Sequence, residues 1–293
     1  EPEASALAFQ GLEPPPFPIR WGHQVVSWKR RLYVLGGLGV GNQLLQDAWV
    51  SKDFGKTWEE LPQPPWCARY SHKAAMIDGK IILVAGLAEN DRRLRDAWES
   101  QDGCLSWTEM PCPRWAARGA HELVTFEMSL GDGQPKEHLI LLGGNGNGNT
   151  ALHDAWASEN GGFSWQELEP PAWPARHSFS AIATKDRIVI CGGSGEGGKK
   201  FNDAWVMTGN VWRTHDKKAL RKQFATDEAA SQVMLAKWEK YGDMPWAARE
   251  HSQLVFFRDQ MVLLGGLNSQ GEIAEDAWAS PDGTTWAQLP PRV

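Results

Sequence analysis

The stretch that decides the fold is "GGLGVGNQLLQDAWVSKDFGKTW", residues 36–58. It opens on a glycine doublet, places an Asp-Ala-Trp triplet ten residues after the second glycine, and ends in a polar turn sequence closed by Trp58. Taken alone, its serine, aspartates and tryptophans have the composition of a reactive site. The rest of the chain decides between that interpretation and a structural one.

The triplet recurs in five copies, and in each copy the aspartate lies ten residues after the second position of a Gly-Gly or Ala-Gly pair. An apolar run such as "IILVAG" or "RIVICGG" precedes each pair, as expected for a strand buried on both faces. An arginine stands further upstream in every copy. The repeated positions are Arg20, Arg69, Arg118, Arg176 and Arg249; Asp47, Asp96, Asp154, Asp203 and Asp276; and Trp49, Trp98, Trp156, Trp205 and Trp278.

One unit therefore predicts four short strands: strand A after the arginine, strand B ending at the glycines, strand C at Asp-Ala-Trp, and strand D at the next tryptophan. We predict one all-β domain over residues 1–293, a five-bladed β-propeller. Phe9 stands eleven residues before Arg20, as Trp58 does before Arg69, so residues 1–16 are expected to be an extension with an extra strand. A six-bladed propeller with an incomplete blade is the alternative. The blades are predicted at residues 17–62, 66–111, 115–169, 173–242 and 246–290.

The order Arg-x-x-His, Gly-Gly and an aromatic residue in strand C resembles the repeat of Kelch propellers, and the resemblance covers residues 17–290. It implies a Kelch-type β-propeller of the kind that commonly binds other proteins. "SKDFGKTW" (51–58) also resembles the Asp-box of sialidase-like propellers, with looser copies in "SQDGCLSW", "SENGGFSW" and "SPDGTTW". That resemblance implies hairpins between strands C and D in which aspartate and glycine form a tight turn.

Residues that recur in every blade are expected to serve the fold, since chemistry rarely needs five copies. The resemblance places the five arginines near the mouth of the central channel, where five unpaired guanidinium groups would repel one another. We expect them to pair with the repeated aspartates; the alternative is that they grip an acidic ligand. The histidines three residues after an arginine, His23, His72 and His121, are expected to pack or hydrogen-bond rather than bind a metal. We predict no catalytic residue, no metal and no cofactor.

Bulk properties exclude several classes of protein. The net charge of -6 gives no reason to expect nucleic acid as a partner. The sequence lacks an apolar run long enough to span a bilayer. Four cysteines without metal-binding spacing are expected to be free thiols, which favours a reducing compartment such as the cytoplasm. The first residues, "EPEASALAFQ", suit a processed chain, including a processed organellar one, or a fragment.

Two kinds of segment break the repeat. Blade 4 carries an insertion at residues 213–237 that is rich in helix-forming residues and is predicted to be a short helical excursion. It is either a decoration or a partner-docking arm, with Lys217, Lys218, Arg221, Lys222, Val233 and Met234 as the docking residues. The loops between strands B and C share their length but not their sequence, and their basic residues are candidates for binding an acidic partner. These residues are Arg92, Arg93, Arg95, Lys199 and Lys200.

The sequence therefore predicts a non-catalytic interaction or scaffold module that binds another protein or a protein complex, and that serves as a peripheral subunit of a larger assembly. The alternative is a propeller that binds a sugar or another small acidic ligand, or a sialic-acid mutarotase-like enzyme, using the channel-mouth arginines and histidines.

Overall fold

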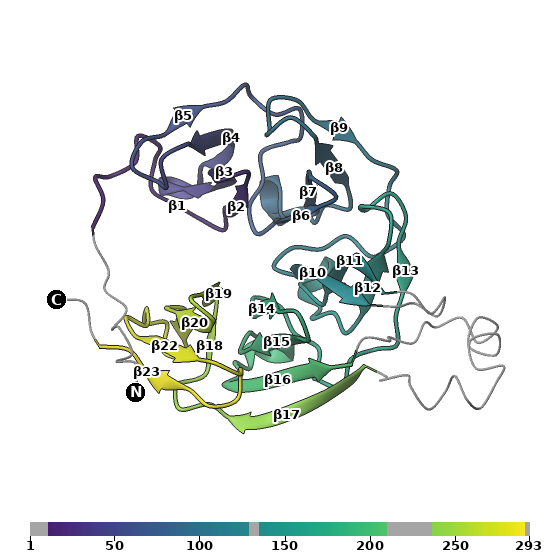
Figure 1. Ribbon diagram of the computed structural model, residues 1–293, viewed down its shortest axis with the longest axis vertical. Helices are drawn as coiled ribbons and strands as arrows, with labels where there is room; N and C mark the ends of the chain where they lie inside the picture. Colours follow the sequence, from purple (N-terminus) through teal and green to yellow (C-terminus); the bar gives the residue numbers. More distant parts are fainter. Residues whose placement is uncertain (1–10, 129–134, 210–235, 291–293) are drawn as a thin grey trace.

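The computed structural model describes residues 11–128, 135–209 and 236–290, and in them the chain forms five antiparallel sheets arranged as the blades of a β-propeller (Figure 1). The predicted five-bladed architecture is confirmed. The strand expected around Phe9 and nearly all of the insertion at 213–237 lie outside the described residues. None of the helical segments in the described ranges has the length and apolar character that a bilayer crossing requires.

Each blade runs through its four strands in chain order. Blade 1 contains β2 (Gln24–Trp28), β3 (Arg31–Gly39), β4 (Leu44–Ser51) and β5 (Glu59–Glu60), with the short β1 (Arg20–Trp21) paired to β3. Blade 2 contains β6 (Lys73–Ile77), β7 (Lys80–Val84), β8 (Ala97–Ser100) and β9 (Thr108–Glu109), and blade 3 contains β10 (Glu122–Met128), β11 (Lys136–Leu142), β12 (Ala155–Ser158) and β13 (Gln166–Glu167).

Blade 4 contains β14 (Ser180–Ala183), β15 (Arg187–Cys191), β16 (Asp203–Thr208) and the longer β17 (Lys237–Asp243). Blade 5 contains β19 (Gln253–Phe257), β20 (Gln260–Leu264), β22 (Ala277–Ser280) and β23 (Ala287–Gln288). The short β18 (Arg249–Glu250), which precedes β19, pairs with β21 (Leu267–Asn268), which lies between β20 and β22. Single turns of 3-10 helix lie in the loops between strands B and C of blades 1–4: η1 (Val40–Asn42), η2 (Glu89–Asp91), η3 (Asn147–Asn149) and η4 (Glu196–Gly198).

The second strand of each blade is apolar on both faces because neighbouring blades cover both. In β7, Ile81 and Leu83 pack toward blade 1, whereas Ile82 and Val84 pack toward blade 3. All four side chains are fully buried. Burial of such a branched or leucine side chain is worth about 1.5–3 kcal/mol, so these strands supply much of the free energy that holds the ring together.

Adjacent blades are joined at the glycine pair. The N–H of the second glycine donates to the carbonyl of the next blade's arginine, over 2.8–2.9 Å, at Gly37–Arg69, Gly86–Arg118, Gly144–Arg176 and Gly193–Arg249. A tryptophan three residues before each of these arginines is buried between the two blades: Trp66, Trp115, Trp173 and Trp246. Each contacts the hairpin tryptophan of its own blade edge to face, with ring centroids 5.0–6.1 Å apart.

A close approach within each blade explains why the second position is always glycine. At Gly144, φ is +114°, and an added Cβ would lie 2.7 Å from the Cβ of His121. Real Cβ atoms do not approach so closely, so the histidine strand would have to move away. Gly148 also has a positive φ of +69°, but an added Cβ there would meet nothing closer than 4.0 Å.

We predict that Gly144→Ala lowers the free energy of unfolding by about 3 kcal/mol, through backbone strain and steric overlap together. Gly148→Ala is the matched control, because it imposes a positive φ without the overlap, and it should cost about 1 kcal/mol. Urea unfolding of the two variants measures the difference. Equal losses would show that the packing of His121 on Gly144 does not constrain this position.

Candidate functional site

Each repeated arginine forms a two-point ion pair with the Asp-Ala-Trp aspartate of its own blade. Arg69 donates through Nη1 and Nη2 to the two carboxylate oxygens of Asp96, at 2.8 and 2.6 Å. The indole Nε1 of Trp98 donates to the same carboxylate at 2.8 Å. The same triad holds Arg20 to Asp47 and Trp49, Arg118 to Asp154 and Trp156, Arg176 to Asp203 and Trp205, and Arg249 to Asp276 and Trp278. This is the pairing expected from the sequence.

Few of the arginine donors remain for a ligand. In Arg118, Nη1 also donates to the carbonyl of Gly143 at 2.7 Å, and Nε donates to the carbonyl of Ala116 at 3.0 Å. Four of the five N–H groups of a guanidinium are thus occupied within the protein. The side chain of Arg118 is fully buried. Each arginine side chain therefore links the start of strand A to the end of strand B and the start of strand C in its own blade.

The ion pairs also shift the acid strength of their carboxyl groups. For Asp276, the hydrogen bond from Arg249 is the largest influence, and it lowers the pKa below the ordinary value. Burial alone would raise the pKa of Asp96, but the hydrogen bond and positive charge of Arg69 outweigh it, and the pKa is again lowered. Both groups are therefore held as carboxylates at neutral pH.

The three candidate histidines lie at the junctions between blades. The ring of His72 packs beside Gly36 of blade 1, whose added Cβ would lie 3.3 Å from the His72 Cε1 atom. His72 and His121 are buried, and burial together with the neighbouring arginine lowers their pKa well below the ordinary value. Burial and then Arg20 also lower the pKa of His23. In the described part of the chain, no group of three or more His, Cys, Asp or Glu side chains is arranged to hold a metal ion.

Residues one or two positions after the arginines form a cluster that the sequence analysis did not single out. Trp21 is 49% exposed, and its ring lies 5.1 Å from that of Tyr70 and 6.2 Å from that of His251. These residues belong to blades 1, 2 and 5, so they meet at one end of the channel. Their backbone pairs with the start of the B-to-C loops, as Trp21 does with Leu38. We call the face that carries these loops the loop face.

Charged residues complete this group. Arg93 donates to the side chains of Asn145, at 3.3 Å, and Asn149, and so ties blade 2 to blade 3. Lys200 forms an ion pair with Glu250 at 2.8 Å, and ties blade 4 to blade 5. His177 lies close enough to Glu250 and Arg93 to interact with their charges. We call Trp21, Tyr70, Arg93, His177, Glu250 and His251 the mouth cluster.

Of the five basic loop residues expected from the sequence to bind an acidic partner, two are thus used between blades. Arg93 and Lys200 are partly buried in the ties just described, whereas Arg92, Arg95 and Lys199 are exposed. The signal that could have revealed the mouth cluster was variation beside a constant residue. The position after each repeated arginine holds Trp21, Tyr70, Gly119, His177 and Glu250 in turn.

The opposite face carries the hairpins between strands C and D. In the first of them, the Ser51 hydroxyl accepts from the N–H of Gly55 at 2.7 Å, and Asp53 accepts from the N–H and hydroxyl of Thr57 at 2.9 and 2.6 Å. The Thr57 hydrogen bonds are the largest influence that lowers the pKa of Asp53 to about 2. The polar residues of the stretch 51–58 therefore stabilise a turn. Exposed apolar residues at these hairpin tips are Phe54, Leu105 and Phe163.

The side chains that line the centre of the ring are mostly apolar. A hollow of about 310 Å³ is lined by the first strands of blades 1–4, with Val26, Ala75, Val124 and Ile182 at matching positions. Its only polar side chains are those of Ser27 and Thr125, and it contains no titratable group. The candidate docking residues Lys217, Lys218, Arg221, Lys222, Val233 and Met234 lie outside the described residues.

Comparison with protein-family models finds no family whose model matches this chain, and comparison with curated proteins finds no matching relative.

We predict that Asp96→Ala lowers the free energy of unfolding by about 3–5 kcal/mol, because it leaves the buried guanidinium of Arg69 without its counter-charge. Glu59→Ala, which breaks the exposed ion pair of Lys52 and Glu59, is the control and should cost about 1 kcal/mol or less. Chemical unfolding at pH 7 measures both. A small loss for both variants would contradict a structural role for the repeated ion pairs.

A second prediction concerns pH. Because the pKa of His121 is lowered on folding, the unfolded chain binds a proton there that the folded chain does not. Stability is thus present above about pH 6.5 and is lost as the pH falls below it. His121→Phe, which places at this junction the residue that blade 4 has at Phe179, should remove up to about 1.4 kcal/mol of this loss per pH unit.

Urea unfolding between pH 7.5 and 5 tests this effect. The reciprocal variant Phe179→His adds a titratable ring at the blade 4 junction, and its stability should fall more steeply with acid than that of the unmodified chain. Parallel curves for all three proteins would contradict the assignment.

Proposed function

We propose that the protein is a non-catalytic Kelch-type propeller that binds another protein through the mouth cluster on its loop face. The observation that carries this proposal is Trp21. Its indole is half exposed and packs edge to face against Tyr70, whose hydroxyl donates to Asp91 in the loop that carries Arg93. Tryptophan, tyrosine and arginine are the residues enriched at the energetic centres of protein interfaces.

The arrangement of polar groups supports binding rather than catalysis. A catalytic site brings titratable groups together in a cavity that a substrate can enter. Here the central hollow is lined by apolar and hydroxyl side chains, and the repeated arginines have their carboxylate partners inside the protein. The variable, exposed residues lie instead on loops that a rigid repeated scaffold holds in place, which is where binding specificity usually resides.

The propeller fold also suits a subunit of a larger assembly. Backbone hydrogen bonds tie each blade to the next from blade 1 to blade 5 and fix the backbone that carries the mouth cluster, so little conformational entropy is lost when a partner docks. Residues from blades 1, 2, 4 and 5 converge on one surface, and a partner would contact several blades at once. The insertion at 213–237 is the competing docking element.

We predict that Trp21→Ala weakens the binding of a partner by about 30-fold, the effect of losing an interface residue worth about 2 kcal/mol. Quantitative pull-down from an extract of the source cells, using the full chain as bait, measures the change. Phe54→Ala is the matched control, because it removes an aromatic ring that is at least as exposed, at 62%, from the hairpin face. We expect it to retain every partner.

A third bait that lacks residues 213–237 separates the two docking elements. Retained partners would support the loop face. If the deletion removes the partners and Trp21→Ala does not, docking takes place through the insertion, and the proposed role of the mouth cluster is wrong. Circular dichroism of each bait confirms that the altered chains are folded.

A further inference from the structure

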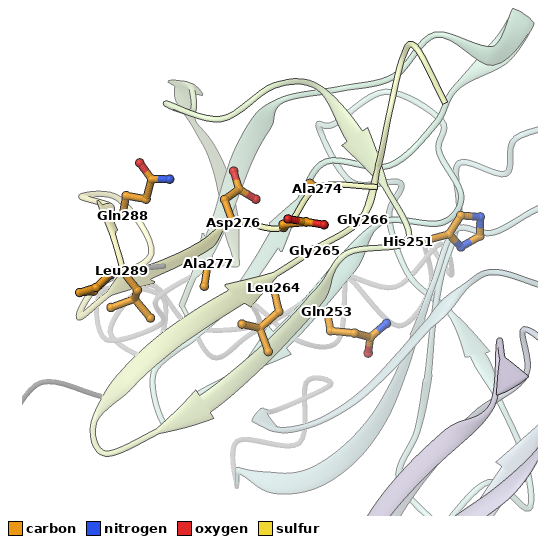
Figure 2. A pocket seen from close by; sticks show the side chains of 12 residues that line it. His251, Gln253, Leu264, Gly265, Gly266, Ala274, Asp276, Ala277, Gln288 and Leu289 are labelled. Carbon is orange, nitrogen blue, oxygen red and sulfur yellow. The ribbon is translucent and has the colours of Figure 1, made fainter. Parts of the chain in front are cut away.

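One face of blade 5 is not covered by another blade in the described part of the chain. Figure 1 shows the ring broken between blade 5 and blade 1. A hollow of about 1100 Å³ lies along this face and is lined from all four strands of the blade, including Gln253, Leu264, Ala277 and Gln288. In Figure 2 the side chains of Leu264 and Leu289 lie on the same side of the sheet.

Several side chains on this face stand at positions that other blades bury. Val124 and Phe126 of blade 3 are 7% and 3% exposed, because blade 4 covers them. Val255 and Phe257, at the same positions in blade 5, are 43% and 50% exposed. Leu264 and Ala277 are partly exposed, whereas their counterparts in blades 1–4 are fully buried. These counterparts are Leu35, Val84, Leu142 and Cys191, and Ala48, Ala97, Ala155 and Ala204.

Two backbone groups at this face are equivalent to the groups that, at the other junctions, hydrogen-bond to the arginine of the following blade. At the junction of blades 2 and 3, the N–H of Arg118 donates to the carbonyl of Leu94, and its carbonyl accepts from the N–H of Gly86. The equivalent groups of blade 5 are the carbonyl of Ala274 and the N–H of Gly266. Among the described residues, neither has such a partner from a following blade.

The facing wall of blade 1 is also incomplete. Phe17 stands three residues before Arg20, where the other four blades have a buried tryptophan. It contacts the rings of Trp49 and Trp58 at 5.6 and 5.2 Å, but it is partly exposed. Val25 of β2 is 53% exposed. Both walls of the break are thus apolar surfaces of the kind that this fold otherwise covers with a blade.

We propose that this break is a docking slot for a sixth blade, supplied by a partner polypeptide that carries one more copy of the repeat. The four existing junctions define its chemistry. The partner must be a four-stranded antiparallel sheet with an arginine whose backbone pairs with Ala274 and Gly266, and a tryptophan three residues before that arginine. The ring contact between Trp21 and His251 lies across the break, at the channel mouth.

The probe for this site is a synthetic peptide of residues 62–111, the blade 2 repeat of this chain, titrated into the full chain. We expect one peptide to bind per chain and to raise its melting temperature. Leu264→Lys should abolish the binding, because it places a charge on the slot face. Leu105→Lys, the same change on the hairpin face, should leave the binding intact. A peptide that changes neither the melting temperature nor amide exchange would overturn the proposal.

Amide hydrogen exchange of the full chain tests the slot without the peptide. The N–H of Gly266 should exchange much faster than those of Gly144 and Gly193, and should become protected when the peptide is added. Equal protection of all three in the free monomer would mean that blade 5 closes directly onto blade 1. Protection that rises with chain concentration would mean that a second copy covers the face. Either result would refute the sixth blade.

The melting temperatures of two lysine variants provide a third test of the proposal. Leu264→Lys should unfold at nearly the temperature of the unmodified chain, because Leu264 is already partly exposed. Leu142→Lys, at the buried equivalent in blade 3, should greatly lower the melting temperature. Similar losses for both would show that the face of blade 5 is covered in solution and would also count against the proposal.

Discussion

Each junction between blades depends on one arginine that acts in two directions. The guanidinium of Arg118 is held by Asp154 of its own blade, while its backbone N–H and carbonyl pair with Leu94 and Gly86 of the preceding blade. A buried ion pair is stabilising only when its hydrogen bonds are complete. The arginine backbone is therefore fixed relative to its own sheet, and the preceding blade docks against a rigid edge. The same arginine therefore stabilises the fold of its own blade and the docking of that blade against the preceding one.

The residues that stabilise the fold and the residues available to bind a partner therefore occupy different positions in the sequence. The arginine, the aspartate and the tryptophan of each blade satisfy one another, so they are the same in all five copies. The Arg-Asp-Trp triad fixes the backbone of the residue that follows the arginine, but the side chain of that residue can vary. This residue lies at the channel mouth. Trp21, Tyr70 and His177 occupy that position in three blades. Constant residues thus build the platform, and their immediate neighbours carry the surface that a partner would meet.

The fold could be predicted from the sequence because the repeat displays each strand five times, with the glycine pair and Asp-Ala-Trp at a constant spacing. The pairing of arginine with aspartate followed from charge repulsion, once the resemblance to Kelch propellers placed the arginines close together. The mouth cluster was not foreseen, because residues 230 positions apart, such as Trp21 and His251, meet only when the ring has formed. Nor does the repeat determine how the ring ends. Phe9 suggests a strand before blade 1, but the spacing within a blade contains no information about the contact between the last blade and the first.

The face of blade 5 differs from the terminal face of an ordinary repeat protein. Stacked repeats need a polar outer surface on their last unit, because an apolar one exposes the surface that neighbouring repeats bury. Blade 5 keeps Val255, Phe257 and Leu264 on this face, at the positions where blade 3 buries Val124, Phe126 and Leu142. It also keeps the Gly-Gly pair, whose first glycine, at Gly36, Gly143 and Gly192, lies against the carbonyl of the following arginine. A unit that retains both the apolar surface and the glycines of an internal blade has the features of a blade with a neighbour on each side.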